Sequence, residues 1–531
     1  MLADLALVRG KVLTMNPSQP CAEAVAVKSD RILKVGTNEE IIRLIGKNTE
    51  VIDLRGKTVV PGFIDTHIHV ADFGRFLTWV DLRDVKSIKE MQSRIRLRAK
   101  STPKGKWIIG HGWDQTHFME QRFPTLLDLN EVSPDNPAVL YHQCGRMCVV
   151  NSKALESAGV TKETNAPSGG YIDKDVETGE PTGVLRENAT DFVWKVIPEY
   201  DEEEIMDSVS LACEKIVEAG VTSVHWLVSS AAEIPIIQRL RVENRLPLRI
   251  YIIIPVNLLS NVTGLGSCKD FGDNLVRIGG VEVSADGYLA AKTAALFQPY
   301  SDDPSANGRL FCTQEEMNAL AVTIRDANLQ LVIHATGDKA VDAALTTIEE
   351  FLKEAPRKDL RCRLEQAAVL NEGLLHRMKK QKVIVSVQPR VIASEYSVWS
   401  ATNHLGPKRA RWLYPLRKLL EEDIMVIGGS DCPMEPLSPL LGIQAAITRE
   451  SYPQERLTVD EALRIYTVNA AYSSNEESIK GSIEEGKLAD LTVLSRNPRT
   501  ISPSKIEAVK VRMTIVSGRV VYPQSVSSGK Y

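Results

Sequence analysis

The stretch PGFIDTHIH at residues 61–69 is the most informative part of this 531-residue chain. It begins with the apolar residues of a buried strand and ends in two histidines, His67 and His69. Because residues i and i+2 of a strand point to the same face, the two imidazoles would lie about 7 Å apart along the backbone. Neutral imidazole is a common zinc ligand. One strand end therefore offers two candidate metal ligands.

Outward from this strand, apolar segments alternate with charged, helix-like segments along the middle of the chain. The expected strands span 60–69, 221–228, 248–256, 276–285, 330–334, 363–367, 383–388 and 425–430. This alternation predicts an α/β fold, the (β/α)8 TIM barrel, whose catalytic residues lie at the carboxyl ends of strands. His334 ends the fifth expected strand and Asp431 follows the eighth. With His67 and His69 they form a candidate four-ligand set.

The two ends of the chain contain short strands and turns and differ from the middle. We expect one split β-sandwich domain built from residues 1–58 and 480–531, with the barrel in residues 59–479. The alternative is two unrelated β-extensions. Residues 73–200 interrupt the alternation after the first barrel strand. We interpret them as an insertion that caps the barrel mouth, since long loops of this kind usually serve a function.

The composition is typical of a soluble globular protein, with 43% hydrophobic and 25% charged residues. A net charge of −4 argues against nucleic acid and anionic membranes as partners, so we expect a small-molecule substrate. No apolar run approaches the roughly 20 residues of a membrane span. The eight cysteines include no CxxC pair, and the first residues lack the pattern of a secretory signal. These features favour a reducing, cytoplasmic location.

Further motifs are spread along nearly the whole chain. They are GWD at 112–114, RFP at 122–124, NSKAL at 151–155, GVLRE at 183–187, ADG at 285–287, HATGDKAVD at 334–342, GSDCPMEPLSPL at 429–440 and EGKLADLTVL at 485–494. Together with residues 61–69 they resemble the amidohydrolase superfamily, nearest the branch of N-substituted formamide deformylases. The resemblance implies a barrel beside a split β-sandwich, one or two divalent metals in the barrel mouth, hydrolysis of C–N bonds, and a homodimer.

The chain departs from the pattern of that branch at three positions. The branch usually carries a lysine that binds metal after carboxylation, and this chain has Glu282, which offers a carboxylate directly. Where the branch has the histidine of an RxEH pattern, this chain has Gln366, whose amide oxygen binds zinc far less well than imidazole. Arg146 stands where relatives tend to carry a histidine. It is either a surface arginine or a guanidinium that selects a carboxylate-bearing substrate.

Two metal arrangements stay open. The four-ligand set named above could hold a single metal. Alternatively, Glu282 replaces His334 in that set, and a weak second metal is held by His334 and Gln366. We favour one divalent metal, Zn²⁺ with Mn²⁺ or Fe²⁺ as alternatives, because loss of the sixth-strand histidine weakens only the second site.

The expected reaction follows from the charge of the metal. A bound Zn²⁺ lowers the pKa of its water from about 15.7 to roughly 7, so a metal-bound hydroxide would attack the carbonyl carbon. Asp431 would accept the proton of that water and pass it to the leaving nitrogen. Gln366 would help to stabilise the oxyanion, and Glu282 would be a ligand or would orient one. Trp113 and His225 are further candidates for contact with the substrate.

The expected function is hydrolysis of a non-peptide C–N bond in an amide, an N-substituted formamide or a cyclic amide. Three alternatives remain at this point. They are deamination of a heterocycle, metal-dependent decarboxylation or elimination on the same scaffold, and a catalytically retired barrel that only binds a ligand.

Overall fold

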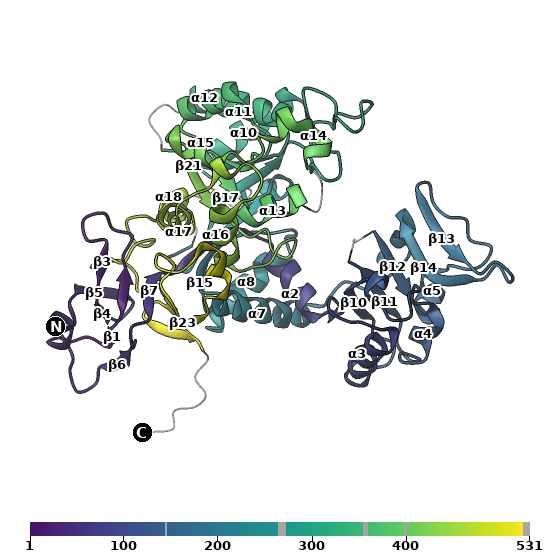
Figure 1. Ribbon diagram of the computed structural model, residues 1–531, viewed down its shortest axis with the longest axis horizontal. Coiled ribbons are helices and arrows are strands. Elements are labelled where there is room, and N and C mark those ends of the chain that lie inside the picture. Colours follow the sequence, from purple (N-terminus) through teal and green to yellow (C-terminus); the bar gives the residue numbers. More distant parts are fainter. Residues whose placement is uncertain (144–145, 264–271, 354–358, 398–400, 524–531) are drawn as a thin grey trace. The chain divides into compact units, whose positions relative to one another are not determined.

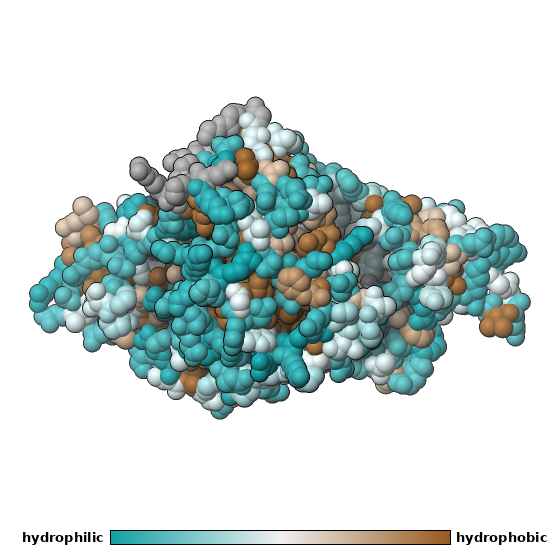
Figure 2. All heavy atoms as spheres, turned by 90° about the horizontal axis from the view of Figure 1, so that it is seen from above, coloured by the Kyte–Doolittle hydropathy of each residue, from teal (hydrophilic) through white to brown (hydrophobic). Residues whose placement is uncertain are grey.

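The computed structural model describes residues 1–143, 146–263, 272–353, 359–397 and 401–523 (Figure 1). Its contacts divide the chain into two units, residues 1–73 together with 209–531, and residues 74–208. Within the described ranges no helix is both long and apolar enough to cross a bilayer. Hydrophilic residues cover most of the face seen in Figure 2, and hydrophobic residues occur among them in small groups.

Eight parallel strands in the first unit form the predicted barrel. In order around the sheet they are β8 (Phe63–Ile68), β15 (Val221–Leu227), β16 (Arg249–Pro255), β17 (Val276–Ser284), β18 (Gln330–Ala335), β19 (Arg363–Gln366), β20 (Ile384–Val387) and β21 (Met425–Gly428). A parallel bridge between Ile68 and Cys432 joins the two end strands, and the His69 N–H donates to the Cys432 carbonyl at 3.0 Å. The (β/α)8 fold predicted from the sequence is therefore confirmed.

Helices follow the barrel strands along the chain. They include α8 (Glu233–Val242), α10 (Gln314–Asp326), α11 (Asp338–Lys353), α12 (Glu372–Gln381), α13 (Pro389–Ser397), α15 (Leu416–Glu421), α16 (Pro439–Thr448), α17 (Val459–Ile465) and α18 (Val468–Ser473). Helix α10 begins with a capping box, in which the side chains of Thr313 and Glu316 each accept the other's backbone N–H. On α11, apolar residues such as Val341, Leu345 and Ile348 are buried at helical spacing.

The first expected strand is divided in two by Gly62. Residues Thr58–Pro61 form β7 in a different sheet, and the barrel strand β8 starts at Phe63. A Cβ at position 62 would meet the Thr222 side chain at 2.1 Å, so only glycine allows this close approach. From the sequence, residues 60–69 were predicted to form one strand, because both β7 and β8 are buried and their residues follow one another without a polar turn.

Strands from the two ends of the chain share a six-stranded sheet (Figure 1). Its order is β24 (Arg519–Tyr522), β23 (Val511–Val516), β22 (Leu491–Leu494), β7, β2 (Lys11–Leu13) and β3 (Cys21–Ala22). The second sheet of this region has the order β5 (Arg31–Gly36), β4 (Ala24–Lys28), β1 (Leu5–Val8) and β6 (Glu50–Asp53). Leu7, Val25, Val59, Leu491 and Ile515 belong to one buried cluster between these strands. The domain boundaries at residues 58 and 480 stay a prediction.

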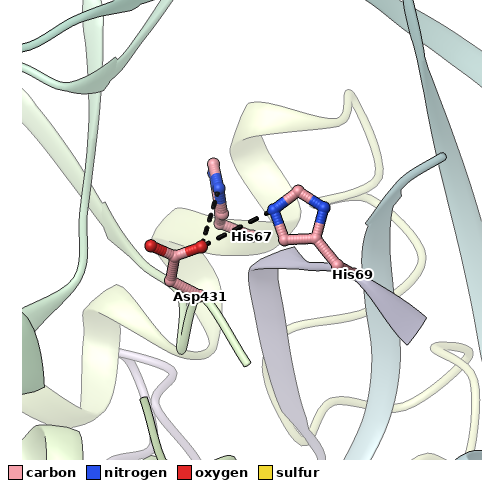
Figure 3. A group of neighbouring side chains, drawn as sticks. All are labelled: His67, His69 and Asp431. Atoms are coloured by element: carbon pink, nitrogen blue, oxygen red, sulfur yellow. Dashed lines mark ion pairs between the residues drawn. The ribbon is translucent and has the colours of Figure 1, made fainter. Parts of the chain in front are cut away.

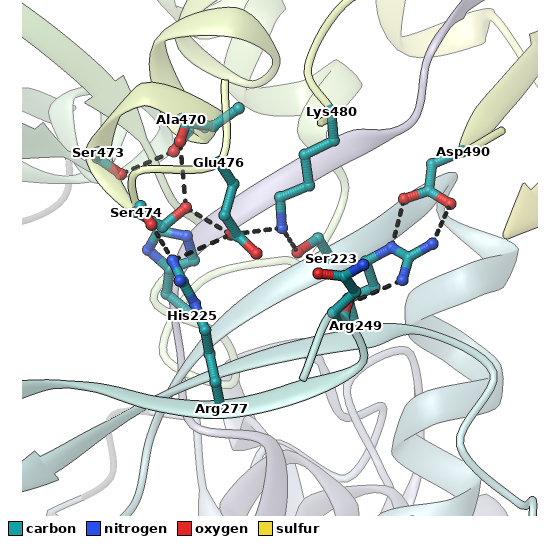
Figure 4. A network of polar contacts seen from close by, with 12 residues as sticks. Ser223, His225, Arg249, Arg277, Ala470, Ser473, Ser474, Glu476, Lys480 and Asp490 are labelled. Atoms are coloured by element: carbon teal, nitrogen blue, oxygen red, sulfur yellow. Dashed lines mark hydrogen bonds and ion pairs between the residues drawn. The ribbon is translucent and has the colours of Figure 1, made fainter. Parts of the chain in front are cut away.

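A buried polar network connects residues 476–490 to the amino-terminal ends of the barrel strands (Figure 4). Lys480 pairs with Glu476 at 2.8 Å and donates to Ser223 Oγ on β15 at 2.7 Å. Arg249, the first residue of β16, donates to both carboxylate oxygens of Asp490 at 2.6 and 3.0 Å. Asp490 directly precedes β22, so this pair links the barrel to the six-stranded sheet.

Replacing Asp490 with asparagine is expected to lower the free energy of unfolding by about 2 kcal/mol, because the buried Arg249 guanidinium loses its counter-charge. Differential scanning calorimetry measures the change as a lower thermal midpoint. Glu422→Gln is the matched control, because Glu422 pairs with Lys379 at 3.0 Å with both side chains about half exposed. That control should change stability by less than about 1 kcal/mol. Equal effects of the two variants would contradict the prediction.

The second unit contains its own six-stranded sheet. Its order is β13 (Gly170–Lys174), β14 (Pro181–Glu187), β12 (Met147–Val150), β11 (Ala138–His142), β10 (Ile108–Trp113) and β9 (Val80–Asp81). Helices α3 (Ile88–Ser101), α4 (Leu126–Asn130) and α5 (Ser152–Ala158) accompany it. Leu82, Met91, Phe118 and Leu140 are among the residues of a hydrophobic core that belongs to this unit alone.

Candidate metal centre

Three of the predicted ligands meet at the carboxyl ends of β8 and β21 (Figure 3). The ligand atoms of His67, His69 and Asp431 all lie within 4.8 Å of one another. Asp431 Oδ1 is 3.5 Å from Nε2 of His67 and 3.6 Å from Nε2 of His69. The imidazole rings are nearly perpendicular, with centroids 5.5 Å apart. Two imidazoles and one carboxylate thus face a common point.

Backbone contacts place Asp431 opposite the histidines. Its N–H donates to the His67 carbonyl at 2.8 Å, and its φ of 62° lies in the left-handed region that non-glycine residues rarely adopt. A Cβ at Gly429 would come within 2.6 Å of His67, so the loop passes directly against β8. Strained backbone of this kind persists where the surrounding structure holds it, as commonly happens at functional sites.

Asp65 also ties these two strand ends together. Its Oδ1 accepts the N–H of Ser430 at 2.9 Å and that of His67 at 3.2 Å. Burial raises the pKa of Asp65 to about 6, although both backbone N–H groups oppose that shift. The carboxyl therefore acts as a fixed acceptor beneath the ligand loop.

A buried ion pair on β19 orients His67 from the barrel interior. Glu365 Oε2 lies 2.6 Å from His67 Nδ1, and Arg363 forms an ion pair with the other Glu365 oxygen. Both charged side chains are completely buried. Burial raises the pKa of Glu365, but Arg363 and His67 outweigh it and lower the pKa to about 2. Because Nδ1 is engaged by a carboxylate, Nε2 is the His67 nitrogen that faces Asp431.

His225 lies within β15, near the carboxyl end where the sequence places it, and contacts this ion pair. The Arg363 guanidinium donates to His225 Nδ1 at 2.8 Å inside the barrel. Burial and the positive charge of Arg363 lower the pKa of His225 well below its usual value, so the imidazole is neutral. A neutral ring that accepts at Nδ1 carries its proton on Nε2. A direct substrate contact by His225 stays a prediction.

His334 and Glu282 lie outside the group of three converging residues, but close enough for the charge of His67 to act on both. Nε2 of His334 is buried and has no hydrogen-bond partner among the described residues. Burial, followed by the charge of His67, lowers the pKa of His334 to about 4, so its imidazole is in the neutral form that binds metals. Burial raises the pKa of Glu282, while the positive charges of His67 and His69 oppose that shift.

The orientation of Gln366 bears on the second metal site. Its φ is 67°, and the Tyr414 hydroxyl donates to its Oε1 at 2.8 Å. Its Nε2 then faces Asp431 Oδ2 at 3.5 Å. The amide oxygen is the atom that would bind a metal, and Tyr414 already engages it. This arrangement favours a donor role for Gln366 over the alternative in which it holds a second metal.

The donor set fits a divalent metal ion. Burial lowers the pKa of His67, but the carboxylates of Glu365 and Asp431 outweigh burial and raise the pKa well above its usual value. Hydrogen bonds and charges from His67 and His69 likewise overcome burial and hold the pKa of Asp431 below its usual range. The site thus attracts positive charge. Nε2 of His334, which no described residue engages, adds a further nitrogen donor of the kind that zinc prefers.

A family model that matches most of the chain identifies the family of this protein. Residues 50–522 match the model of the amidohydrolase family. The chain belongs to this family. The resemblance found in the sequence motifs is thereby confirmed.

Relatives of this amidohydrolase cover it almost from end to end. YtcJ of Bacillus subtilis (strain 168), which bears the name of an amidohydrolase, is 31% identical and covers 97% of this chain and 99% of its own. The N-substituted formamide deformylase of Arthrobacter pascens is 29% identical, with 99% of each chain covered. A solved structure of an uncharacterized metal-dependent hydrolase from Pyrococcus furiosus is 31% identical, with a TM-score of 0.79 over 93% of this chain and 100% of that one. The protein is therefore a metal-dependent hydrolase of the amidohydrolase type.

Two predicted substrate-binding residues of the amidohydrolase lie in its second unit. Trp113 is fully buried in the hydrophobic core, and its indole N–H donates to the Leu140 carbonyl at 2.8 Å. This buried position does not support the predicted contact between Trp113 and the substrate, which stays a prediction. Arg146 is exposed and lies 3.9 Å from the Glu187 carboxylate. Its role in selecting a substrate stays a prediction.

Glu395 on α13 is a buried carboxyl that forms no ion pair with any residue inside the described ranges. The residue is 4% exposed, and its Oε2 finds no hydrogen-bond partner among the residues that the structure describes. Burial, followed by the charge of Glu435, raises the pKa of Glu395 from 4.5 to about 7. Arg390 lies 3.6 Å from Glu435 and so pairs with the neighbouring carboxylate.

Glu395→Gln is therefore expected to stabilise the protein at high pH. The folded state favours protonated Glu395, so the wild type has its full stability below pH 4.5 and loses part of it as the pH rises from 4.5 to about 7, whereas the neutral glutamine is unaffected. The loss amounts to about 3 kcal/mol for such a pKa difference. Thermal midpoints of both proteins at several pH values test this expectation. A difference between variant and wild type that does not grow with pH would contradict it.

Proposed function

We propose that the protein is a zinc-dependent hydrolase that cleaves a non-peptide C–N bond in a small amide, N-substituted formamide or cyclic amide. The convergence of His67, His69 and Asp431 at the barrel mouth is the observation that carries this proposal. Nε2 of His334 has no hydrogen-bond partner in the described part of the chain and adds a candidate fourth ligand. A relative that matches 99% of this chain is named for deformylation of N-substituted formamides, which is a reaction of this class.

The side chains have separate roles in this reaction. A divalent cation held by His67, His69, His334 and Asp431 would polarise a carbonyl group and make water more acidic. The carboxylate of Asp431 accepts a proton from the attacking water and passes it to the leaving nitrogen. Glu365 keeps His67 in one orientation through Nδ1. The Gln366 N–H points toward Asp431, where it can donate to an oxygen that gains charge in the transition state.

A metal-dependence assay tests the proposal. Protein loaded with zinc, manganese or iron is offered N-substituted formamides, secondary amides, lactams and heterocyclic amidines, and the released amine or ammonia is measured. We expect amide hydrolysis that a chelator abolishes and added metal restores. Ammonia release from the amidines alone would favour the deaminase alternative. No turnover of any substrate by a metal-loaded protein would overturn the proposal.

We also propose a cytoplasmic location and a homodimer. The location is supported by the cysteines of the described residues, which are all unpaired, as is typical of a reducing compartment. The dimer rests on the resemblance to the family. Light scattering of the purified protein distinguishes a dimer from a monomer.

A further inference from the structure

Gln388 extends the barrel interior at the carboxyl end of β20. Two residues earlier, Ser386 Oγ lies 3.4 Å from Thr66 Oγ1 and accepts a hydrogen bond from Arg363 at 3.2 Å. Ser386 therefore faces the interior. Gln388 directly follows β20, and if the alternation of the strand continues by one residue, its side chain lies on the same interior face, about 7 Å nearer the mouth.

The strand registers place Gln388 beside the candidate metal centre. Ser386 is level with Glu365 on β19 and with Ile427 on β21. Beyond these pairs, the Gly429 N–H after β21 donates to the carbonyl of Val387, the residue before Gln388, at 3.0 Å, and the last residue of β19, Gln366, has a left-handed backbone. Those two strand ends carry Gln366 and Asp431, so Gln388 lies between the segments that hold the reacting groups.

The Gln388 carboxamide lacks partners within the described protein. The residue is 0% exposed, and neither Nε2 nor Oε1 has a hydrogen-bond partner among the described residues. A buried amide that makes no hydrogen bond costs free energy, and most buried polar groups avoid that cost. Gln330 on β18 shows the usual arrangement. Its Nε2 donates to the carbonyls of Arg361 and Ser473 at 2.9 and 2.7 Å, and its Oε1 accepts from Tyr251 at 3.2 Å.

A carboxamide presents one donor and one acceptor side by side. Its full complement is a group that carries a carbonyl oxygen and an N–H on the same edge. A cyclic amide has this arrangement because the ring holds its amide bond cis, whereas an open-chain secondary amide places the two atoms on opposite sides. We propose that Gln388 is a substrate-recognition residue that pairs with the N–H and C=O edge of a cyclic amide. This proposal rests on the proposed function and narrows its substrate class.

The first test measures stability without substrate. Gln388→Met keeps a similar volume and removes the unpaired amide, so its thermal midpoint should equal or exceed that of the wild type. Gln330→Met is the matched control, because it removes a fully paired buried amide, and its midpoint should fall. A fall in Gln388→Met as large as that in Gln330→Met would show that Gln388 is paired within the protein and would overturn the proposal.

The second test measures recognition with δ-valerolactam and its N-methyl derivative, which lacks the N–H. Wild-type kcat/KM should favour the N–H lactam by about 10-fold to 100-fold, as for one lost buried hydrogen bond. In Gln388→Met this preference should shrink to about threefold or less. An unchanged preference would refute the assignment.

Failure of the proposed function can be distinguished from failure of this inference. If the wild type hydrolyses no amide, the proposed function is wrong, and calorimetric titration of δ-valerolactam into metal-free protein then tests Gln388 alone. Binding that is lost in Gln388→Met supports the recognition role. Absence of binding to the wild type, or equal binding to both proteins, contradicts it.

Discussion

Asp431→Asn is expected to reduce kcat/KM by at least about 1,000-fold and to lower the metal content of the purified protein. An asparagine side chain cannot accept the proton of the attacking water, and its neutral oxygen is a weaker ligand than a carboxylate. The variant also leaves His67 and His69 without the negative charge that lies 3.5 and 3.6 Å from their Nε2 atoms. Metal per chain, measured on protein purified without chelator, gives a readout that is independent of the substrate.

Two companion variants sharpen this test. Glu435→Gln removes a carboxylate of similar burial four residues further along the same loop. The metal content of this variant should equal that of the wild type. Gln366→His offers an imidazole where the family pattern has one, and metal content should rise from one toward two. Full metal content in Asp431→Asn, or a wild type that binds no zinc, manganese or iron, would contradict the assignment of the metal centre.

Glu365→Leu is expected to destabilise the protein by about 3–5 kcal/mol, because Arg363 would remain fully buried without its counter-charge. Glu365→Gln keeps the size of the side chain but replaces the carboxylate that engages His67 Nδ1 at 2.6 Å. Loss of such an orienting group typically weakens metal binding 10- to 100-fold. Competition with a chromophoric chelator measures zinc affinity, and calorimetry measures stability.

The double variant Arg363→Met with Glu365→Met separates the two effects. Removing both charges should cost less stability than Glu365→Leu alone, because no unpaired charge is left in the barrel. Zinc affinity should still fall, since His67 loses its carboxylate partner. Wild-type affinity in both Glu365→Gln and the double variant would show that His67 needs no orienting group.

The barrel was predictable because strand-like segments, most of them rich in apolar residues and ending in polar ones, alternate with helix-like segments along the chain. The expected strand 221–228 corresponds to β15, Val221–Leu227, and Asp431 follows the eighth strand as expected. The sequence also contains a sign of the buried ion pair. Arg363 and Glu365 alternate with apolar residues in a short buried strand, and two charges on the interior face of such a strand indicate a functional pair.

Other features had no local signal. The orientation of Gln366 depends on a left-handed backbone and on Tyr414, which is 48 residues away in the sequence. His225 lies between Val224 and Trp226 near the end of its strand, and its orientation is decided by a guanidinium on a different strand. Long-range contacts of this kind arise only when the strands assemble, so a single sequence does not reveal them.

The sheet that joins both chain ends has a consequence for biosynthesis. Strand β7 pairs with β22, and the pair joins Val59 to Val493. During translation the edge of β7 that faces β22 therefore stays unpaired until residues 491–494 have left the ribosome, while its other edge can already pair with β2. Exposed strand edges are sites of aggregation, and contacts between distant parts of a chain form slowly. Nascent chains stalled before residue 491 should consequently be bound by chaperones and cleaved readily by proteases.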